Sequence, residues 1–187
     1  MAMVRSGQQA VLLVVDVQVG VMAQAWQAAQ VIGQVALAVQ RARAQGVPVL
    51  WVQHHQDGEL ETGTPDWQWV PALQPAPAEP LFHKRFNSAF EDTALEATLA
   101  RLGASHIVLA GAASNWCIRA TAYAALERGY DLTLLGDAHS TPDMTLDDGT
   151  LIEAAQVVRE LNTAMSWLSY PGRRNRCSTA AGVDFSA

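Results

Sequence analysis

The chain contains short runs of consecutive apolar residues that end abruptly at a polar residue or a glycine. Residues 10–15 read Ala-Val-Leu-Leu-Val-Val and are followed by Asp16, and residues 107–110 read Ile-Val-Leu-Ala and are followed by Gly111. A continuous apolar run of this length is typical of a strand with both faces covered. Such strands belong to parallel sheets flanked by helices, which restricts the fold to the α/β class.

Between these runs, apolar residues recur at helical spacing. The spacing predicts helices over about residues 23–45, 93–103, 115–128 and 151–167, three of which stop near a glycine. Further strands are predicted at 47–52, 81–83 and 130–135, and a weaker pattern after Pro171 leaves room for a sixth strand. The alternation predicts one three-layer α/β/α domain over residues 1–187, with a doubly wound, mostly parallel sheet.

Charge and cysteine usage argue against several classes of partner. The 187-residue chain has a formal net charge of −6, and its one basic cluster (Arg173, Arg174 and Arg176) is too short to form a nucleic-acid or anionic-membrane surface. No apolar run approaches the roughly 20 residues that span a bilayer, and no signal-peptide core precedes the first strand. The two cysteines provide no disulfide framework. We therefore expect a cytoplasmic protein that binds neither nucleic acid nor membrane.

Residues 53–80 are poor in periodicity and contain five prolines. A connection of this length in a compact domain usually has a functional role. Trp67 and Trp69 give it an apolar face, which would either cover a pocket or pin the loop to the surface, and the pattern leaves both alternatives open.

Cys117 lies where a predicted helix begins. Unpaired N–H groups and the positive end of the helix dipole favour an anion there, so the thiol is expected to be more acidic than usual. The same N–H groups suit a developing oxyanion. Taken alone, a single cysteine is more often a small buried hydrophobe than a nucleophile.

Two further polar residues follow strands in the same way. Asp16 ends the first predicted strand and Lys84 ends the third, and in a doubly wound sheet the carboxyl ends of the strands form the ligand-binding edge. Asp16 and Cys117 are expected on adjacent strands at the switch point, with Lys84 reaching them from farther across.

These residues resemble the isochorismatase-like cysteine hydrolases, a superfamily that includes nicotinamidases and carbamoylsarcosine amidases. The resemblance covers about residues 10–167 and rests on Leu-Leu-Val-Val-Asp-Val-Gln at 12–18, the lysine of His-Lys-Arg-Phe at 83–86, and Gly-Ala-Ala-Ser-Asn-Trp-Cys at 111–117. It implies a six-stranded sheet in the order 3-2-1-4-5-6 and a catalytic triad of Asp16, Lys84 and Cys117.

The resemblance also implies a cis peptide bond between Ala112 and Ala113, which would turn the Ala113 N–H toward the site beside that of Cys117 as an oxyanion hole. The implied reaction is hydrolysis of a small-molecule amide. The Cys117 thiolate attacks the carbonyl carbon, Asp16 transfers protons, Lys84 balances the charge, and water then hydrolyses a thioester. The family likeness further implies a homo-oligomer, either a dimer or a tetramer.

The sequence departs from the nicotinamidases at their metal site. Their Asp-x-His motif is replaced by Gln-His-His-Gln-Asp at 53–57, where His54 and His55 would point to opposite faces of an extended segment. We therefore predict no metal and no other cofactor, and we disfavour nicotinamide as the substrate. The residues predicted to line the substrate pocket are Gln18, Trp26, His54 and Trp116.

The remaining histidines, an arginine and a tyrosine are not expected to take part in the reaction. His83 and His106 are expected to be structural, His139 is expected to be solvated near the rim of the site, and Arg119 and Tyr123 are expected to pack within the chain or against a second subunit.

Two alternatives to an amide hydrolase remain. One is a vinyl ether hydrolase of the isochorismatase type, which has no need of a thiol nucleophile. The other is a non-catalytic binding protein on the same fold. A nucleotide-binding module is disfavoured, because no strand is followed by a Gly-x-Gly-x-x-Gly or phosphate-loop pattern.

Overall fold

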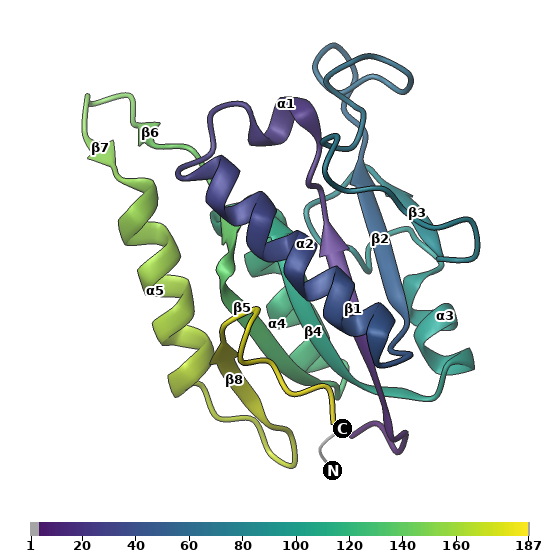
Figure 1. The fold of residues 1–187 in the computed structure, drawn as a ribbon. Helices are drawn as coiled ribbons and strands as arrows, with labels where there is room; N and C mark the ends of the chain where they lie inside the picture. Colours follow the sequence, from purple (N-terminus) through teal and green to yellow (C-terminus); the bar gives the residue numbers. More distant parts are fainter. Residues whose placement is uncertain (1–3, 187) are drawn as a thin grey trace.

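The computed structural model describes residues 4–186 and is built on a parallel sheet (Figure 1). Within these residues the main sheet has six strands in the order β3-β2-β1-β4-β5-β8, and every pair of neighbours is parallel. This is the predicted order, with β8 as the sixth strand. The strands are β1 (Gln9–Val15), β2 (Val49–His54), β3 (Leu81–Lys84), β4 (Ala104–Ala112), β5 (Asp131–Ser140) and β8 (Asn175–Ser178).

Helices cover both faces of the sheet and give three layers. Alternate residues of β1 point to opposite faces, so Leu12 and Val14 pack with α2 (Ala28–Ala44), whereas Leu13 and Val15 pack with α3 (Leu95–Arg101) and α4 (Arg119–Glu127). The α5 helix (Ala154–Trp167) joins the second face through Leu161 and Met165. Burial on both faces explains why β1 is apolar throughout.

The first predicted helix begins later in the structure than at the predicted residue 23. A short helix α1 (Val19–Met22) ends before residue 23, and α2 begins only at Ala28. Gln27 has a left-handed backbone (φ 51°), and the Trp26 N–H donates to the carbonyl of Thr141 at 3.0 Å. The helical spacing concealed this break because apolar side chains continue through it.

Two other predicted boundaries were wrong. β5 extends to Ser140 instead of ending at residue 135, so residues 136–140 are strand and not loop. The last helix begins at Ala154, because Leu151–Ile152 (β7) pairs with Met144–Thr145 (β6) in a small antiparallel hairpin. No helix in the described part of the chain is long and apolar enough to cross a membrane.

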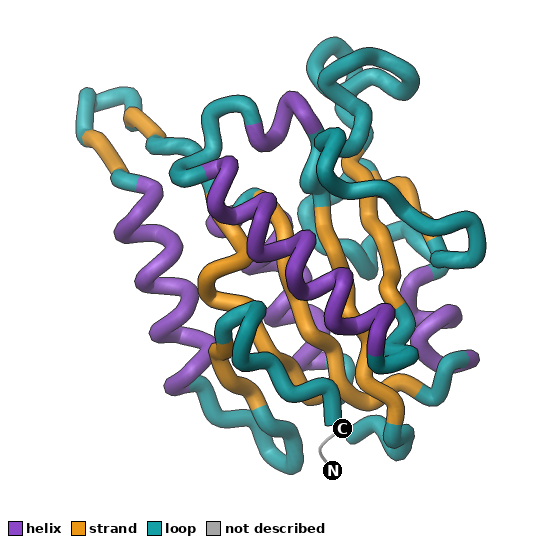
Figure 2. Tube along the Cα trace, viewed as in Figure 1, coloured by secondary structure: helices purple, strands orange, loops and turns teal. Residues whose placement is uncertain are grey.

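The long connection between β2 and β3 is irregular (Figure 2). Trp69 packs edge-on against Trp51 of β2 with ring centroids 5.1 Å apart, and Trp67 stacks on His83 of β3 at 5.4 Å. Both tryptophans therefore pin this segment to the sheet.

Candidate active site

Three strand ends bring Asp16, Lys84 and Cys117 together. Asp16 follows β1, Lys84 ends the edge strand β3, and Cys117 lies in a single π-helical turn, η1 (Ser114–Ile118), between β4 and α4. The Lys84 Nζ lies 2.6 Å from Oδ2 of Asp16 and 3.1 Å from Sγ of Cys117. All three side chains are at least nine-tenths buried. The arrangement places an ammonium in contact with both a carboxylate and a thiol.

The backbone at this junction is unusual at two adjacent strand ends. Asp16 has a left-handed conformation (φ 53°), which is uncommon for a residue other than glycine. On β4, Gly111 has φ 128°, and a Cβ there would lie 1.9 Å from the carbonyl oxygen of Val15. Only glycine fits at this position, so the close approach of β1 and β4 depends on it.

The turn before Cys117 contains a cis peptide bond and an irregular hydrogen-bond pattern. The Ala112–Ala113 peptide bond is cis. The Ala113 carbonyl accepts hydrogen bonds from the N–H groups of Trp116 and Ile118, both at 3.1 Å, and not from that of Cys117 between them. Ala113 and Cys117 both line the cavity next to the sulfur.

Burial changes the protonation of the thiol in the opposite direction from the one predicted. Desolvation and the nearby Asp16 carboxylate raise the pKa of Cys117 to about 12, although Lys84 opposes the shift. The prediction of an acidic thiol was wrong because the helix begins inside the protein, where the cost of burying a thiolate outweighs the helix dipole. Cys117 is therefore a neutral thiol at neutral pH.

The two charged partners are coupled to each other. Burial raises the pKa of the Asp16 carboxyl, while the Lys84 ammonium pulls it down. Burial also disfavours the ammonium of Lys84, but Asp16 and Cys117 more than compensate and raise the pKa of Lys84. The lysine consequently stays charged, and the carboxyl is a stronger base than an exposed aspartate.

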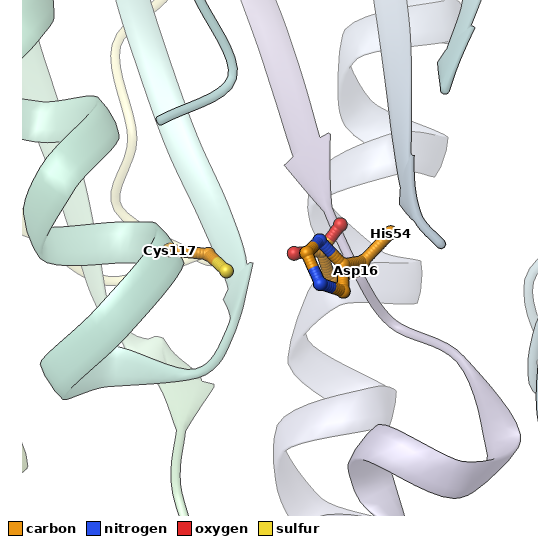
Figure 3. Close-up of side chains that lie close together, drawn as sticks. All are labelled: Asp16, His54 and Cys117. Carbon is orange, nitrogen blue, oxygen red and sulfur yellow. The ribbon is translucent and has the colours of Figure 1, made fainter. Parts of the chain in front are cut away.

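His54 completes the contacts of Lys84. Its Nδ1 lies 3.0 Å from the Lys84 Nζ, and burial together with the lysine charge lowers the pKa of His54 to about 4. The imidazole is therefore neutral, and since Nδ1 accepts from Lys84, its proton is on Nε2. Figure 3 shows the His54 ring beside Asp16, with the sulfur of Cys117 directed toward them.

Asp16, His54 and Cys117 also form the group of potential metal ligands found among residues 4–186, with ligand atoms within 4.8 Å of one another. Lys84 Nζ lies within 3.1 Å of an atom of each of the three. A metal ion bound to all three would have to displace this ammonium, so the arrangement does not fit a metal site. His55 faces away and contacts Asp57 at 2.8 Å and Thr62 at 3.0 Å.

A cavity of about 280 Å³ lies over the sulfur, and two of the four predicted pocket residues line it. These are His54 and the half-exposed Trp116. Gln18 is fully buried behind His54, accepting from its N–H at 2.8 Å and donating to its carbonyl at 3.0 Å, so it positions His54. Trp26 lines a different cavity between α2 and α5.

The sequence reasoning missed three residues that line the pocket, Val21, Gln56 and Asn87. Asn87 follows Lys84 by three positions, and that proximity in the sequence was the available clue. Gln56 lies in the long irregular connection, where no periodicity indicates which side chains face inward.

His139 is buried, not solvated as predicted, because β5 extends through it. Its Nδ1 accepts from the Ser114 hydroxyl at 2.7 Å and its Nε2 donates to Oδ1 of Asn162 at 2.8 Å. The amide of Asn162 donates to the Gly136 carbonyl at 3.0 Å, which fixes its orientation. Burial lowers the pKa of His139. A neutral histidine thus holds the turn that carries Cys117.

The other candidate residues have packing roles. His83 stacks on Trp67, and Nε2 of His106 lies 2.8 Å from the Thr133 hydroxyl. Arg119 forms an ion pair with Glu160 of α5, and Tyr123 is half-buried against the core.

Comparison of the sequence with known proteins identifies a matching family and several relatives. The isochorismatase domain model matches residues 10–166. A streptothricin hydrolase of Streptomyces noursei is 35% identical over 138 residues, which cover 71% of this chain and 50% of that protein. A ureidoacrylate amidohydrolase of Methylobacterium radiotolerans is 31% identical over 139 residues, covering 58% and 54%. The chain thus spans about half the length of these curated relatives.

Solved structures agree with the sequence comparison. An isochorismatase from Pseudomonas putida KT2440 superposes with a TM-score of 0.85 at 26% identity, covering 94% of this chain and 90% of that one. A cysteine hydrolase from Pseudomonas syringae pv. phaseolicola has a TM-score of 0.84 at 23% identity, covering 92% and 89%, and supports the fold. The domain match spans most of the chain, and the chain belongs to the isochorismatase family.

Proposed function

We propose that the protein is a cysteine-dependent hydrolase that cleaves the C–N bond of a small-molecule amide through a thioester. The observation that carries this proposal is the buried Lys84 ammonium bridging the Asp16 carboxylate and the Cys117 thiol, two groups that line a cavity. The relatives named as a streptothricin hydrolase and a ureidoacrylate amidohydrolase support a hydrolase of this class.

The first half of the reaction acylates the cysteine. Asp16 takes the thiol proton as Sγ attacks the carbonyl carbon, and Lys84 stabilises the developing thiolate. The resulting oxyanion lies within reach of the Ala113 and Cys117 N–H groups. When the C–N bond breaks, the protonated Asp16 gives its proton to the leaving nitrogen, so ammonia or an amine departs and a thioester remains.

The second half releases the acid. Asp16 accepts a proton from water as the water oxygen attacks the thioester carbon, and the same N–H groups hold the second oxyanion. Collapse breaks the C–S bond, and the proton on Asp16 returns to the sulfur. Each step uses groups of this chain and one water molecule, and no cofactor is required.

The activity test compares Cys117→Ala with Cys177→Ser on a panel of small amides. The Cys117→Ala variant should lose at least about a thousand-fold in kcat, because the nucleophile is removed, whereas the matched variant at the other cysteine should retain activity. Quenched turnover analysed by mass spectrometry should detect an acyl group on Cys117. Equal activity in the two variants would refute the proposal.

The same experiment separates the alternatives. A vinyl ether hydrolase would act without an acyl adduct and would survive the loss of Cys117. A non-catalytic binding protein would bind ligands with no turnover. The family likeness also supports a homodimer or homotetramer, which light scattering on the purified protein measures.

A further inference from the structure

The cavity over Cys117 continues outward into a second cavity of about 500 Å³. Val21, Ala113 and Trp116 line both cavities, so they form the boundary between an inner compartment at the sulfur and an outer compartment near the surface. A substrate larger than the inner compartment must extend into the outer one.

The outer cavity is negatively charged. Glu59 and Asp66 line it, and no lysine or arginine lines either cavity in the part of the chain that the structure describes. Within that same part, neither carboxylate takes part in a salt bridge. The net charge of −6 adds to the negative potential at the mouth of the site.

Glu59 is held in place by Gln56, a residue of the inner cavity. The side-chain amide of Gln56 donates to Oε2 of Glu59 at 3.0 Å, and Gln56 itself lines the inner cavity. The backbone between them is closed by two hydrogen bonds of Gln56 with Leu60, at 2.9 and 3.3 Å. The carboxylate is therefore presented by a closed turn instead of a free loop.

Asp66 is fixed from the other side by α1. Its carbonyl accepts from the Gly20 N–H at 2.9 Å. A Cβ on Gly20 would lie 2.8 Å from Cβ of Asp66 and 3.0 Å from Cδ2 of Leu60, so the absence of a side chain allows both loop segments to close over this helix. The two acidic segments thus converge on one point of the cavity wall.

Trp116 contributes an aromatic surface between the compartments. About half of its side chain is exposed (52%), and it directly precedes the nucleophile. The face of an indole ring attracts a cation within about 6 Å of its centroid. A positively charged group held against Trp116 would share the outer cavity with the carboxylates of Glu59 and Asp66.

We propose that the substrate is a cationic amide, whose carbonyl lies at Cys117 and whose ammonium or guanidinium group lies in the outer cavity between Glu59 and Asp66. This inference rests on the amide hydrolysis proposed above and specifies the chemical class of the substrate. Anionic amides are disfavoured by the same two carboxylates.

The first test measures charge preference at Cys117 without requiring a substrate. Three methanethiosulfonate reagents of similar chain length, the cationic 2-aminoethyl, the neutral propyl and the anionic 2-sulfonatoethyl compounds, each form a mixed disulfide with release of methanesulfinate. Mass spectrometry of the Cys117 peptide gives the rate for each. The cationic reagent should react fastest and the anionic one slowest, with the difference shrinking at high salt.

Variants that remove the charges of Glu59 and Asp66 test whether these two carboxylates cause the charge preference at Cys117. The double variant Glu59→Gln/Asp66→Asn should reduce the ratio of cationic to anionic rates by about ten-fold, since each exposed carboxylate contributes about three-fold. Glu127→Gln is the matched control, because Glu127 is exposed at the end of α4 farthest from Cys117 and its variant should keep the ratio. A ratio that does not change in the double variant would overturn the inference of a cationic substrate and would leave the proposed function standing. Failure of the wild-type protein to hydrolyse any amide of the panel would overturn the proposed function.

Turnover provides the second measurement. 5-Aminopentanamide and hexanamide have the same shape and differ in an ammonium against a methyl group. Wild-type protein should have the higher kcat/KM for the cationic amide, by about ten-fold, and the double variant should remove this difference. Cleavage of both amides at equal rates would preserve the proposed function and refute the cationic substrate.

Discussion

The ion pair between Lys84 and Asp16 makes a quantitative prediction about stability. Two unit charges 2.6 Å apart attract by about 6 kcal/mol at an effective dielectric constant of about 20, and both side chains are almost fully inaccessible to solvent. Much of this attraction offsets the cost of burying the charges. Removing one partner leaves the other buried and uncompensated, which typically costs about 3–5 kcal/mol. The Lys84→Met variant, which keeps most of the side-chain volume, should lose this amount of unfolding free energy at neutral pH.

The loss should depend on pH in one direction. Without the ammonium, nothing opposes the effect of burial on Asp16, so the pKa of this carboxyl rises further above its already raised value. A group with a raised folded-state pKa contributes stability that is present at acid pH and is lost as the pH rises through that pKa. The deficit of Lys84→Met relative to the wild type should therefore be larger at pH 8 than at pH 5.

A double variant isolates the charge effect from packing. Asp16→Asn/Lys84→Met has no buried charge at this position and should recover at least about 2 kcal/mol of the loss, with little dependence on pH. Urea unfolding followed by circular dichroism at both pH values measures the wild type, the single variant and the double variant. The reasoning is refuted if the single and double variants unfold at the same urea concentration, because the loss would then be steric.

Three other predictions concern the surroundings of the site. Because burial raises the pKa of Cys117 to about 12, its alkylation by iodoacetamide in the free protein should accelerate by about ten-fold per pH unit between pH 8 and 10, and a plateau near pH 7 would contradict the raised pKa. His139→Phe should cost about 1–3 kcal/mol in urea unfolding because it leaves the buried Ser114 hydroxyl unpaired, whereas His139→Asn, which keeps an acceptor near the Nδ1 position, should cost less. Gly111→Ala should lose more than about 3 kcal/mol, because its Cβ would overlap the Val15 carbonyl, whereas the control Gly33→Ala in α2, where the new methyl meets nothing within 4 Å, should be neutral or gain up to about 1 kcal/mol in the same assay.

The sequence was most informative where one physical rule determines the structure. Apolar runs identified β1 and β4 because both faces of these strands are buried, and the order of the sheet followed from the family likeness. Helix starts were less predictable, since the break before Ala28 depends on a hydrogen bond from Trp26 to Thr141, more than a hundred residues away. Contacts of that kind leave no trace in local periodicity.

The same distinction explains the errors at the site. The strand-end rule brought Asp16, Lys84 and Cys117 to one edge, but the thiol pKa depends on how deeply that edge is covered. Trp26 was placed in the wrong cavity because it lines the one between α2 and α5, and His139 was placed in solvent because the extension of β5 was missed. Burial is a property of the assembled layers, and single positions in the sequence do not encode it.

The raised pKa values of Asp16 and Cys117 have a joint consequence for the proposed reaction. If only the thiol pKa were raised, proton transfer to an ordinary aspartate would be strongly unfavourable. Burial raises the pKa of both groups, so the carboxylate becomes a better base as the thiol becomes a weaker acid. Lys84 contacts both and favours the charged form of whichever group lacks the proton. The free protein thus holds an unreactive thiol beside its base, and a thiolate forms only when a carbonyl carbon is in position to receive it.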